Sequence, residues 1–203
     1  MEVFADTADI AEITKWLRRG VLDGVTTNPS IMLKDGVRDM EKAAREIAEV
    51  LEGRPVSVEV TSNDPDEMLG QAQAYATWAP NIVVKIPIIN EDGAPCLEVI
   101  RALAADGIKV NATAMLSFNQ VMLAAKAGAA YLSIFAGRVA DEGHDAFVAR
   151  LLRQHFIIRE RAAHPDDVLL QIEGSRGRSP VERSVSLNSA TSSWKCRSAA
   201  ASL

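Results

Sequence analysis

The sequence places one lysine in the middle of a short apolar run. Lys85 lies in residues 81–88, NIVVKIPI, whose length and β-branched residues indicate a strand buried on both faces. Burial without a partner disfavours an ammonium group, so this lysine requires an explanation. One explanation is a charge on an edge strand that prevents aggregation. The other is a partly neutral amine that attacks a carbonyl group and forms a Schiff base.

Polar residues recur at alternate positions of the neighbouring predicted strands, so each strand presents them on one face. The interior of a barrel is usually filled by Val, Ile and Leu. Polar residues in strand after strand therefore favour one shared pocket over separate internal hydrogen bonds. The residues in phase are Asp6, Thr26, Asn28, Ser57, Glu59, Thr61, Asn111, Thr113 and Ser133, with Phe135 two positions further on. Together these polar residues favour the interpretation of Lys85 as a Schiff-base nucleophile over that of a charge on an edge strand.

The elements that must position these residues alternate regularly over the first 174 residues. Strands are predicted at 3–6, 24–27, 55–61, 81–88, 109–115, 131–137 and 167–173. Helices are predicted at 9–19, 37–51, 64–78, 97–105, 117–128 and 145–161, with residues 28–30 as a connection. This alternation indicates parallel βαβ units. Without a dinucleotide-binding glycine fingerprint, it favours a closed (β/α)8 TIM barrel over a doubly wound sheet.

Residues 1–174 are thus expected to form a single catalytic barrel domain, with the last one or two βα units atypical or incomplete. Residues 175–203 hold nine serines and four arginines, a composition typical of disorder. Residues 185–187 are the candidate for a weak eighth strand, and no convincing final helix follows. Two readings stay open: a barrel that closes untidily, or a tail that is not barrel sequence, as an altered reading frame would produce.

Composition excludes several classes of function. A chain of 203 residues fits one domain with a sizeable core, and a net charge of -5 without long charge runs argues against nucleic acid as a partner. Cys96 and Cys196 are far apart and lack a nearby histidine cluster, so neither a disulfide framework nor a zinc site is expected. The N-terminus lacks the apolar region of a signal peptide, and no apolar run approaches a membrane span. We expect a soluble, cytoplasmic protein.

Several motifs, in order and spacing, resemble those of the transaldolase family. They are residues 24–31 (GVTTNPSI), 84–87 (VKIP), 111–113 (NAT) and 133–138 (SIFAGR). The resemblance covers about residues 2–145 and is closest to the short branch, which includes small transaldolases and fructose-6-phosphate aldolase. Ile134 stands where the family usually has proline. Beyond the sixth strand the resemblance fades.

The resemblance implies a cofactor-free enzyme of the pentose phosphate pathway. Such an enzyme moves a dihydroxyacetone unit from sedoheptulose 7-phosphate or fructose 6-phosphate to glyceraldehyde 3-phosphate or erythrose 4-phosphate. Its partners would be these sugar phosphates, and it would form a homo-oligomer if the C-terminus permits. A metal-dependent aldolase is disfavoured because His144, His155 and His164 fall in a helical region and not at strand ends.

The resemblance also implies a role for each candidate residue. Lys85 would form the Schiff base, and Asp6 would exchange the hydroxyl proton during carbon–carbon cleavage. Glu59 and Thr113 would hold the water that shuttles protons. The expected substrate-binding residues are Thr26, Asn28, Asn111, Ser133, Phe135, Arg138, Ser175 and Arg176. Arg138, Ser175 and Arg176 would bind phosphate, although a surface salt bridge with Asp141 and Glu142 is an alternative for Arg138.

Two positions bear on the choice of reaction. Glu59 and Phe135 are expected in transaldolases, whereas the aldolase relatives tend to carry glutamine and tyrosine there. Transfer to an acceptor is therefore favoured over cleavage that releases free dihydroxyacetone. Two alternatives are kept. One is an aldolase that cleaves fructose 6-phosphate and releases dihydroxyacetone. The other is a catalytically impaired barrel whose altered C-terminus prevents assembly.

Overall fold

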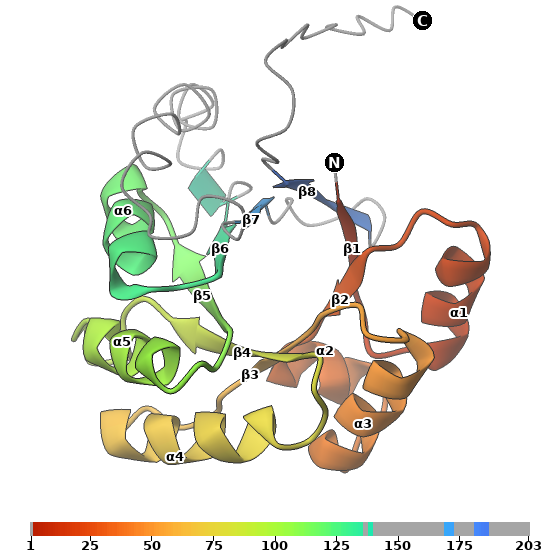
Figure 1. The fold of residues 1–203 in the computed structure, drawn as a ribbon, viewed down its shortest axis with the longest axis horizontal. Helices are drawn as coiled ribbons and strands as arrows, with labels where there is room; N and C mark the ends of the chain where they lie inside the picture. The colour runs from red at the N-terminus through yellow and green to blue at the C-terminus, as the bar shows by residue number, and fades with distance from the viewer. Residues whose placement is uncertain (1, 136–137, 140–168, 173–180, 187–203) are drawn as a thin grey trace, which may run out of the picture.

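The strands of the chain close into a barrel in sequence order (Figure 1). A computed structural model describes residues 2–135, 138–139, 169–172 and 181–186. The strands are β1 (Val3–Asp6), β2 (Gly24–Thr26), β3 (Val56–Glu59), β4 (Ile82–Pro87), β5 (Val110–Met115), β6 (Tyr131–Ile134), β7 (Leu169–Ile172) and β8 (Val181–Ser186). Each of β1 to β6 pairs in parallel with the strand that follows it, up to β7. The predicted barrel is confirmed.

The helices lie outside the ring of strands (Figure 1). They are α1 (Ile10–Arg18), α2 (Pro29–Lys34), α3 (Met40–Val50), α4 (Pro65–Ala76), α5 (Leu97–Ala105) and α6 (Phe118–Ala127). The side chain directly before the first residue explains where several of them begin: Asp9 and Asp64 accept hydrogen bonds from the first turns of α1 and α4, and Ser117 forms a capping box with Gln120. Among the described residues, no helix has the length and apolarity to cross a membrane.

The helix α2 corrects the prediction that residues 28–30 only connect two elements. The Asn28 side chain accepts a hydrogen bond from the Ile31 amide at 2.8 Å, and Pro29 occupies the first turn. The single helix predicted for 37–51 begins at Met40 instead, where Asp39 caps it. Asparagine followed by proline is a helix-start signal, and the sequence therefore contained the information that predicts α2.

The last strand departs from the parallel pattern. β8 runs antiparallel to both β7 and β1, with Ile172 paired to Arg183 and Phe4 paired to Glu182. Only residues 173–180 separate β7 from β8. A parallel crossover needs a dozen or more residues, whereas antiparallel neighbours can be joined by a short connection, so this spacing accounts for the direction of β8. The atypical final unit is confirmed, and β8 lies inside the segment 175–203 that the sequence analysis separates from the barrel.

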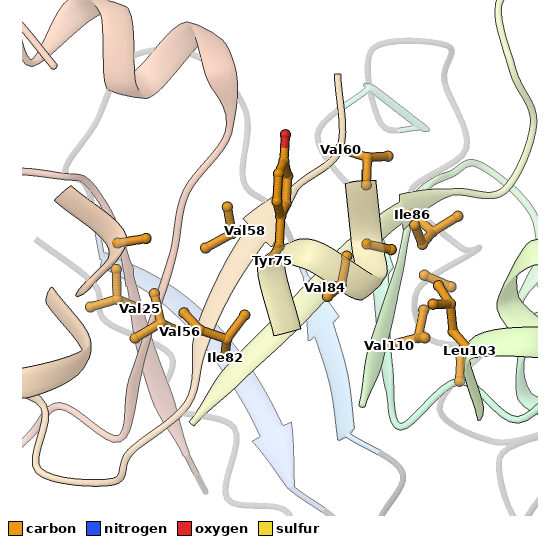
Figure 2. Packing of buried hydrophobic residues seen from close by; sticks show 14 of the residues in the cluster. Val25, Val56, Val58, Val60, Tyr75, Ile82, Val84, Ile86, Leu103 and Val110 are labelled. Carbon is orange, nitrogen blue, oxygen red and sulfur yellow. The ribbon is translucent and has the colours of Figure 1, made fainter. Parts of the chain in front are cut away.

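The outward faces of the strands form the hydrophobic core with the helices. Figure 2 shows aliphatic residues of neighbouring strands beside Tyr75 of α4 and Leu103 of α5. The strand residues labelled there are Val25, Val56, Val58, Ile82, Val84, Ile86 and Val110, all buried. Because strand side chains alternate, burial of these positions against helices turns the residues between them toward the barrel interior.

Candidate active site

Lys85 lies on an interior strand of the barrel. β4 is paired with β3 on one side and β5 on the other, and the lysine is 2% exposed. The edge-strand explanation for this residue is therefore wrong. Its Nζ lies 3.6 Å from Oε2 of Glu59, the residue directly beside it in the β3–β4 register. The structure thus brings together the two residues expected to be the nucleophile and a proton carrier.

Burial and pairing act on this lysine in opposite directions. Loss of water disfavours the ammonium form, whereas the neighbouring carboxylate favours it. The Glu59 side chain is 24% exposed, so the pair contacts water through the glutamate and not through the lysine. An amine in this setting has an acceptor for its proton within reach, which is what a carbonyl-attacking lysine requires.

A hydrogen-bonded chain of buried polar residues crosses the barrel interior beside Lys85. The Asn111 side chain donates from Nδ2 to Oγ of Ser57 at 3.2 Å and accepts from Oγ of Ser133 at 2.8 Å. Ser57 is on β3 and Asn111 on β5, on either side of β4. Their side chains can meet only on the inner face, which places all three residues inside the barrel.

Ser57 is a site residue that the sequence analysis placed in phase but assigned no role. Its position two residues before Glu59 on the same strand was the available signal. As the acceptor for Nδ2, its hydroxyl fixes which end of the Asn111 amide faces which neighbour.

Asp6 is held by a threonine on the next strand. The fully buried Thr26 donates from Oγ1 to Oδ1 of Asp6 at 3.0 Å, and the two residues are direct partners in the β1–β2 register. Thr26 is in turn the register partner of Ser57. Asp6, Thr26, Ser57, Asn111 and Ser133 therefore follow one another around the interior from β1 to β6.

Thr113 carries a buried hydroxyl of an unusual kind. It is 1% exposed, and among the described residues its Oγ1 is the one buried side-chain polar atom without a hydrogen-bond partner. Nearly all buried hydroxyls in proteins have a partner, so one that lacks a protein partner is suited to bind water or substrate. Thr113 lies beside Pro87 in the β4–β5 register, two residues beyond Lys85.

The remaining predicted residues have more varied positions. Asn28 uses its side-chain oxygen to cap α2, which leaves the amide nitrogen as its donor toward a ligand. Arg138 is exposed, with Cζ 5.1 Å from the ring centroid of Phe135. Ser175 and Arg176, the two other predicted phosphate ligands, lie outside the described residues. Outside them too are Asp141, Glu142, His144, His155 and His164.

An asparagine that sequence reasoning missed joins the two loops that follow Glu59 and Lys85. Asn63 accepts from the Glu91 amide at 2.7 Å and donates from Nδ2 to Oδ2 of Asp92 at 2.9 Å. Its backbone carbonyl accepts from Nδ2 of Asn90 at 3.3 Å. Nothing in the sequence connects residue 63 with residues 90–92, because only the barrel brings their loops together.

Comparison with known proteins identifies the family. The family model described as transaldolase/fructose-6-phosphate aldolase matches residues 3–164. A probable transaldolase of Dehalococcoides mccartyi is 47% identical over 148 residues, which cover 73% of this chain and 67% of that protein. Probable transaldolase 2 of Listeria monocytogenes is 44% identical over 148 residues, 73% of this chain and 65% of the relative.

A probable transaldolase of Streptococcus agalactiae is 43% identical over 157 residues, 77% of this chain and 70% of that protein. The chain spans about two thirds of the length of these relatives. The family match extends over most of the chain, including every strand from β1 to β6 that carries the interior polar residues. The chain belongs to the transaldolase/fructose-6-phosphate aldolase family.

Proposed function

We propose that this chain is a transaldolase that transfers a dihydroxyacetone unit between sugar phosphates through a Schiff base on Lys85. The observation that carries the proposal is the burial of Lys85 inside the barrel, 3.6 Å from Glu59. The family membership and the names of the relatives support the same reaction. In this role the enzyme belongs to the pentose phosphate pathway and acts in the cytoplasm.

The first step is attack of the neutral Lys85 amine on the ketone carbon of the donor sugar. The resulting carbinolamine loses its hydroxyl group as water and becomes an iminium ion. One proton must leave the amine and another must reach the departing hydroxyl. In this proposal Glu59 takes up and returns these protons, which its 3.6 Å distance from Lys85 supports, and the Thr113 hydroxyl holds the water that relays them.

The second step is cleavage of the carbon–carbon bond. Asp6 removes the proton of the hydroxyl next to that bond, an aldehyde forms, and the bonding electrons pass to the iminium nitrogen to give an enamine. The acceptor aldehyde then reacts with the enamine carbon, Asp6 returns a proton to the new hydroxyl, and water hydrolyses the resulting iminium ion to release the new ketose and the free Lys85 amine. Thr26 holds the Asp6 carboxylate in one orientation through both halves of the reaction.

The bound three-carbon unit needs hydrogen-bonding groups for its own hydroxyls. Asn111 and Ser133 lie on the strands after Lys85 and are fixed to each other, and Asn28 offers an amide nitrogen at the end of β2. Arg138, stacked over Phe135, supplies the planar guanidinium that suits the paired oxygens of a phosphate. Ser175 and Arg176 remain the predicted partners of Arg138 at the phosphate.

Borohydride trapping tests the Schiff base directly. The folded chain is incubated with fructose 6-phosphate and reduced, and peptides are analysed by mass spectrometry. We expect the mass of the reduced sugar-derived unit on Lys85 and none on the Lys85→Met variant. A folded wild-type sample in which Lys85 gains no such mass would refute the mechanism.

The family also includes aldolases that release free dihydroxyacetone, and a second experiment separates the two reactions. With fructose 6-phosphate alone, a transaldolase holds the enamine and releases little free dihydroxyacetone; when an acceptor aldehyde is added, the unit leaves as part of the new ketose. Glu59 and Phe135 support transfer. Rapid release of dihydroxyacetone without an acceptor would instead assign the aldolase reaction.

The antiparallel β8 supports one further candidate, a barrel with impaired turnover. Such a chain would melt cooperatively and trap the sugar on Lys85, yet would not transfer it to an acceptor. Measuring trapping and transfer on the same folded sample distinguishes this case from a working transaldolase. Sedimentation of that sample would also test the predicted homo-oligomer.

A further inference from the structure

The strand β5 contains a backbone irregularity directly after Thr113. Ala114 has a φ of 60°, a left-handed conformation that is uncommon for a residue with a side chain. Among the described residues, the other non-glycine residue with positive φ is Glu52, which lies in an exposed turn after α3. Of these two residues, only Ala114 lies within a strand of the barrel.

The irregularity is a β-bulge. Ala112 pairs with Leu132 and Met115 pairs with Ile134, so β5 advances three residues while β6 advances two. The extra residue changes which face the following side chain takes. In a regular strand Met115 would share the inner face with Thr113. Met115 instead is fully buried in the hydrophobic cluster that contains Ala112, Leu132 and Ile134.

Hydrogen bonds from both neighbouring strands hold the bulge in place. On one side the Ile88 amide donates to the Thr113 carbonyl at 2.9 Å. On the other the Phe135 amide donates to the Met115 carbonyl at 3.0 Å. Thr113 is thus fixed to the strand of Lys85 and Met115 to the strand of Ser133. Ala114 bridges the two, and such strained residues persist where their surroundings determine them.

We propose that Ala114 is a positioning residue, whose left-handed conformation keeps the Thr113 hydroxyl on the inner face while Met115 enters the core. The bulge interrupts the regular strand one residue beyond Thr113, whose hydroxyl has no hydrogen-bond partner among the described residues to orient it. The backbone is therefore what fixes the direction of Thr113. The inference rests on the proposed function, because it assigns the effect of Ala114 to the part that Thr113 plays in imine formation.

A matched pair of variants tests the proposal, with the rate of borohydride trapping at Lys85 as readout. Asparagine and leucine have similar size, but asparagine adopts positive φ readily and leucine does not. Ala114 is partly exposed. We expect Ala114→Asn to trap within about threefold of wild type and Ala114→Leu to trap at least about tenfold more slowly, with KM little changed.

A double variant separates positioning from a general structural effect. If Ala114 acts through Thr113, adding Ala114→Leu to Thr113→Val should slow trapping by less than about twofold beyond Thr113→Val alone. Losses that multiply would show a separate structural role and overturn the proposal. Should Ala114→Leu not fold, Ala114→Asn and Ala114→Gly still decide, since a tenfold loss in either folded variant contradicts it.

The outcomes also distinguish this inference from the proposed function. Wild-type protein that never traps the sugar refutes the Schiff-base mechanism itself. Wild-type protein that traps while a folded Ala114→Leu variant matches its rate refutes only the role of Ala114.

Discussion

Nζ of Lys85 lies 3.6 Å from Oε2 of Glu59, yet the two side chains differ in their access to water, at 2% and 24% exposure. The lysine depends on the protein to compensate its charge, whereas the glutamate can be partly hydrated. Removing one partner or the other should therefore have unequal consequences for stability.

Glu59→Ala should destabilise the fold by about 2 kcal/mol, because it takes the carboxylate away from a buried ammonium group. Lys85→Met should change stability by less than about 1 kcal/mol, since an apolar chain of similar length replaces the lysine and Glu59 still reaches water. Urea denaturation of both variants measures the difference. Equal losses of stability in the two variants would show that the greater exposure of Glu59 does not make the two substitutions unequal.

Ser57→Ala should slow catalysis although Ser57 does not contact the reacting nitrogen in any described interaction. The change removes the 3.2 Å hydrogen bond from the buried Nδ2 of Asn111, a loss of about 1 kcal/mol, and loosens the amide that Ser133 also holds. We expect a lower kcat and a lower melting temperature. Ser30→Ala, at an exposed position of α2, is the control and should leave both unchanged.

Gly24 is required by the packing at the N-terminal end of the barrel. A Cβ on Gly24 would overlap the ring of Phe4, with Cδ1 2.7 Å away, and the ring itself packs edge-on against Tyr131. Gly24→Ala should cost about 1–3 kcal/mol through forced repacking. Gly70→Ala is the matched control: Gly70 lies in α4, a Cβ there would meet no atom of another element within 4 Å, and the change should stabilise the helix by about 0.5–1 kcal/mol. Thermal melts showing both variants alike would contradict this account.

The contrast between these sites shows what local sequence signals predict and what they leave out. Alternation of polar and apolar residues was enough to place Asp6, Glu59, Lys85 and Ser133 on one inner face, because the period of a strand is fixed. Helix starts at Asp9, Asp64 and Ser117 follow from side chains that cap their own backbone. Both kinds of signal act within one element.

The features that could not be predicted depend on neighbouring elements. The bulge at Ala114 arises because β4 and β6 each fix a different residue of β5, which alternation alone does not encode. The hydrogen bond between Ser57 and Asn111 joins two strands that lie on either side of β4, so it depends on the barrel that brings their inner faces together. The antiparallel direction of β8 follows from the short connection after β7. The length of that connection is known only once the bounds of β8 are known.

Cys96 should resist alkylation in the folded chain. It is 2% exposed, and burial raises the pKa of its thiol, so the reactive thiolate forms only at a pH higher than usual. We expect iodoacetamide at pH 8 to modify Cys96 at least about tenfold more slowly in buffer than in urea, measured on the Cys96 peptide alone. Equal rates in the two conditions would mean that this side chain is not enclosed in the native state.

Asn63→Ala should affect catalysis from outside the barrel interior. The substitution removes two side-chain hydrogen bonds between the loops that follow Lys85 and Glu59, to the Glu91 amide at 2.7 Å and to Asp92 at 2.9 Å. The bond from Asn90 to the backbone carbonyl of residue 63 remains, so the loops are held together less firmly. Because both loops are surface segments, we expect a stability loss of only about 1 kcal/mol. The larger effect should be on kcat, since relative movement of these loops disturbs the strand ends that set the Lys85–Glu59 separation.

The control for Asn63 is Asn119→Ala, an exposed position in α6 whose loss should change neither quantity. Asn63→Asp provides a further comparison, because the carboxylate keeps the acceptor for Glu91 but opposes Asp92. It should therefore lower kcat at neutral pH and regain part of it when Asp92 is also changed to Asn. If Asn63→Ala matches Asn119→Ala in kcat and stability, the two loops keep their positions without the asparagine.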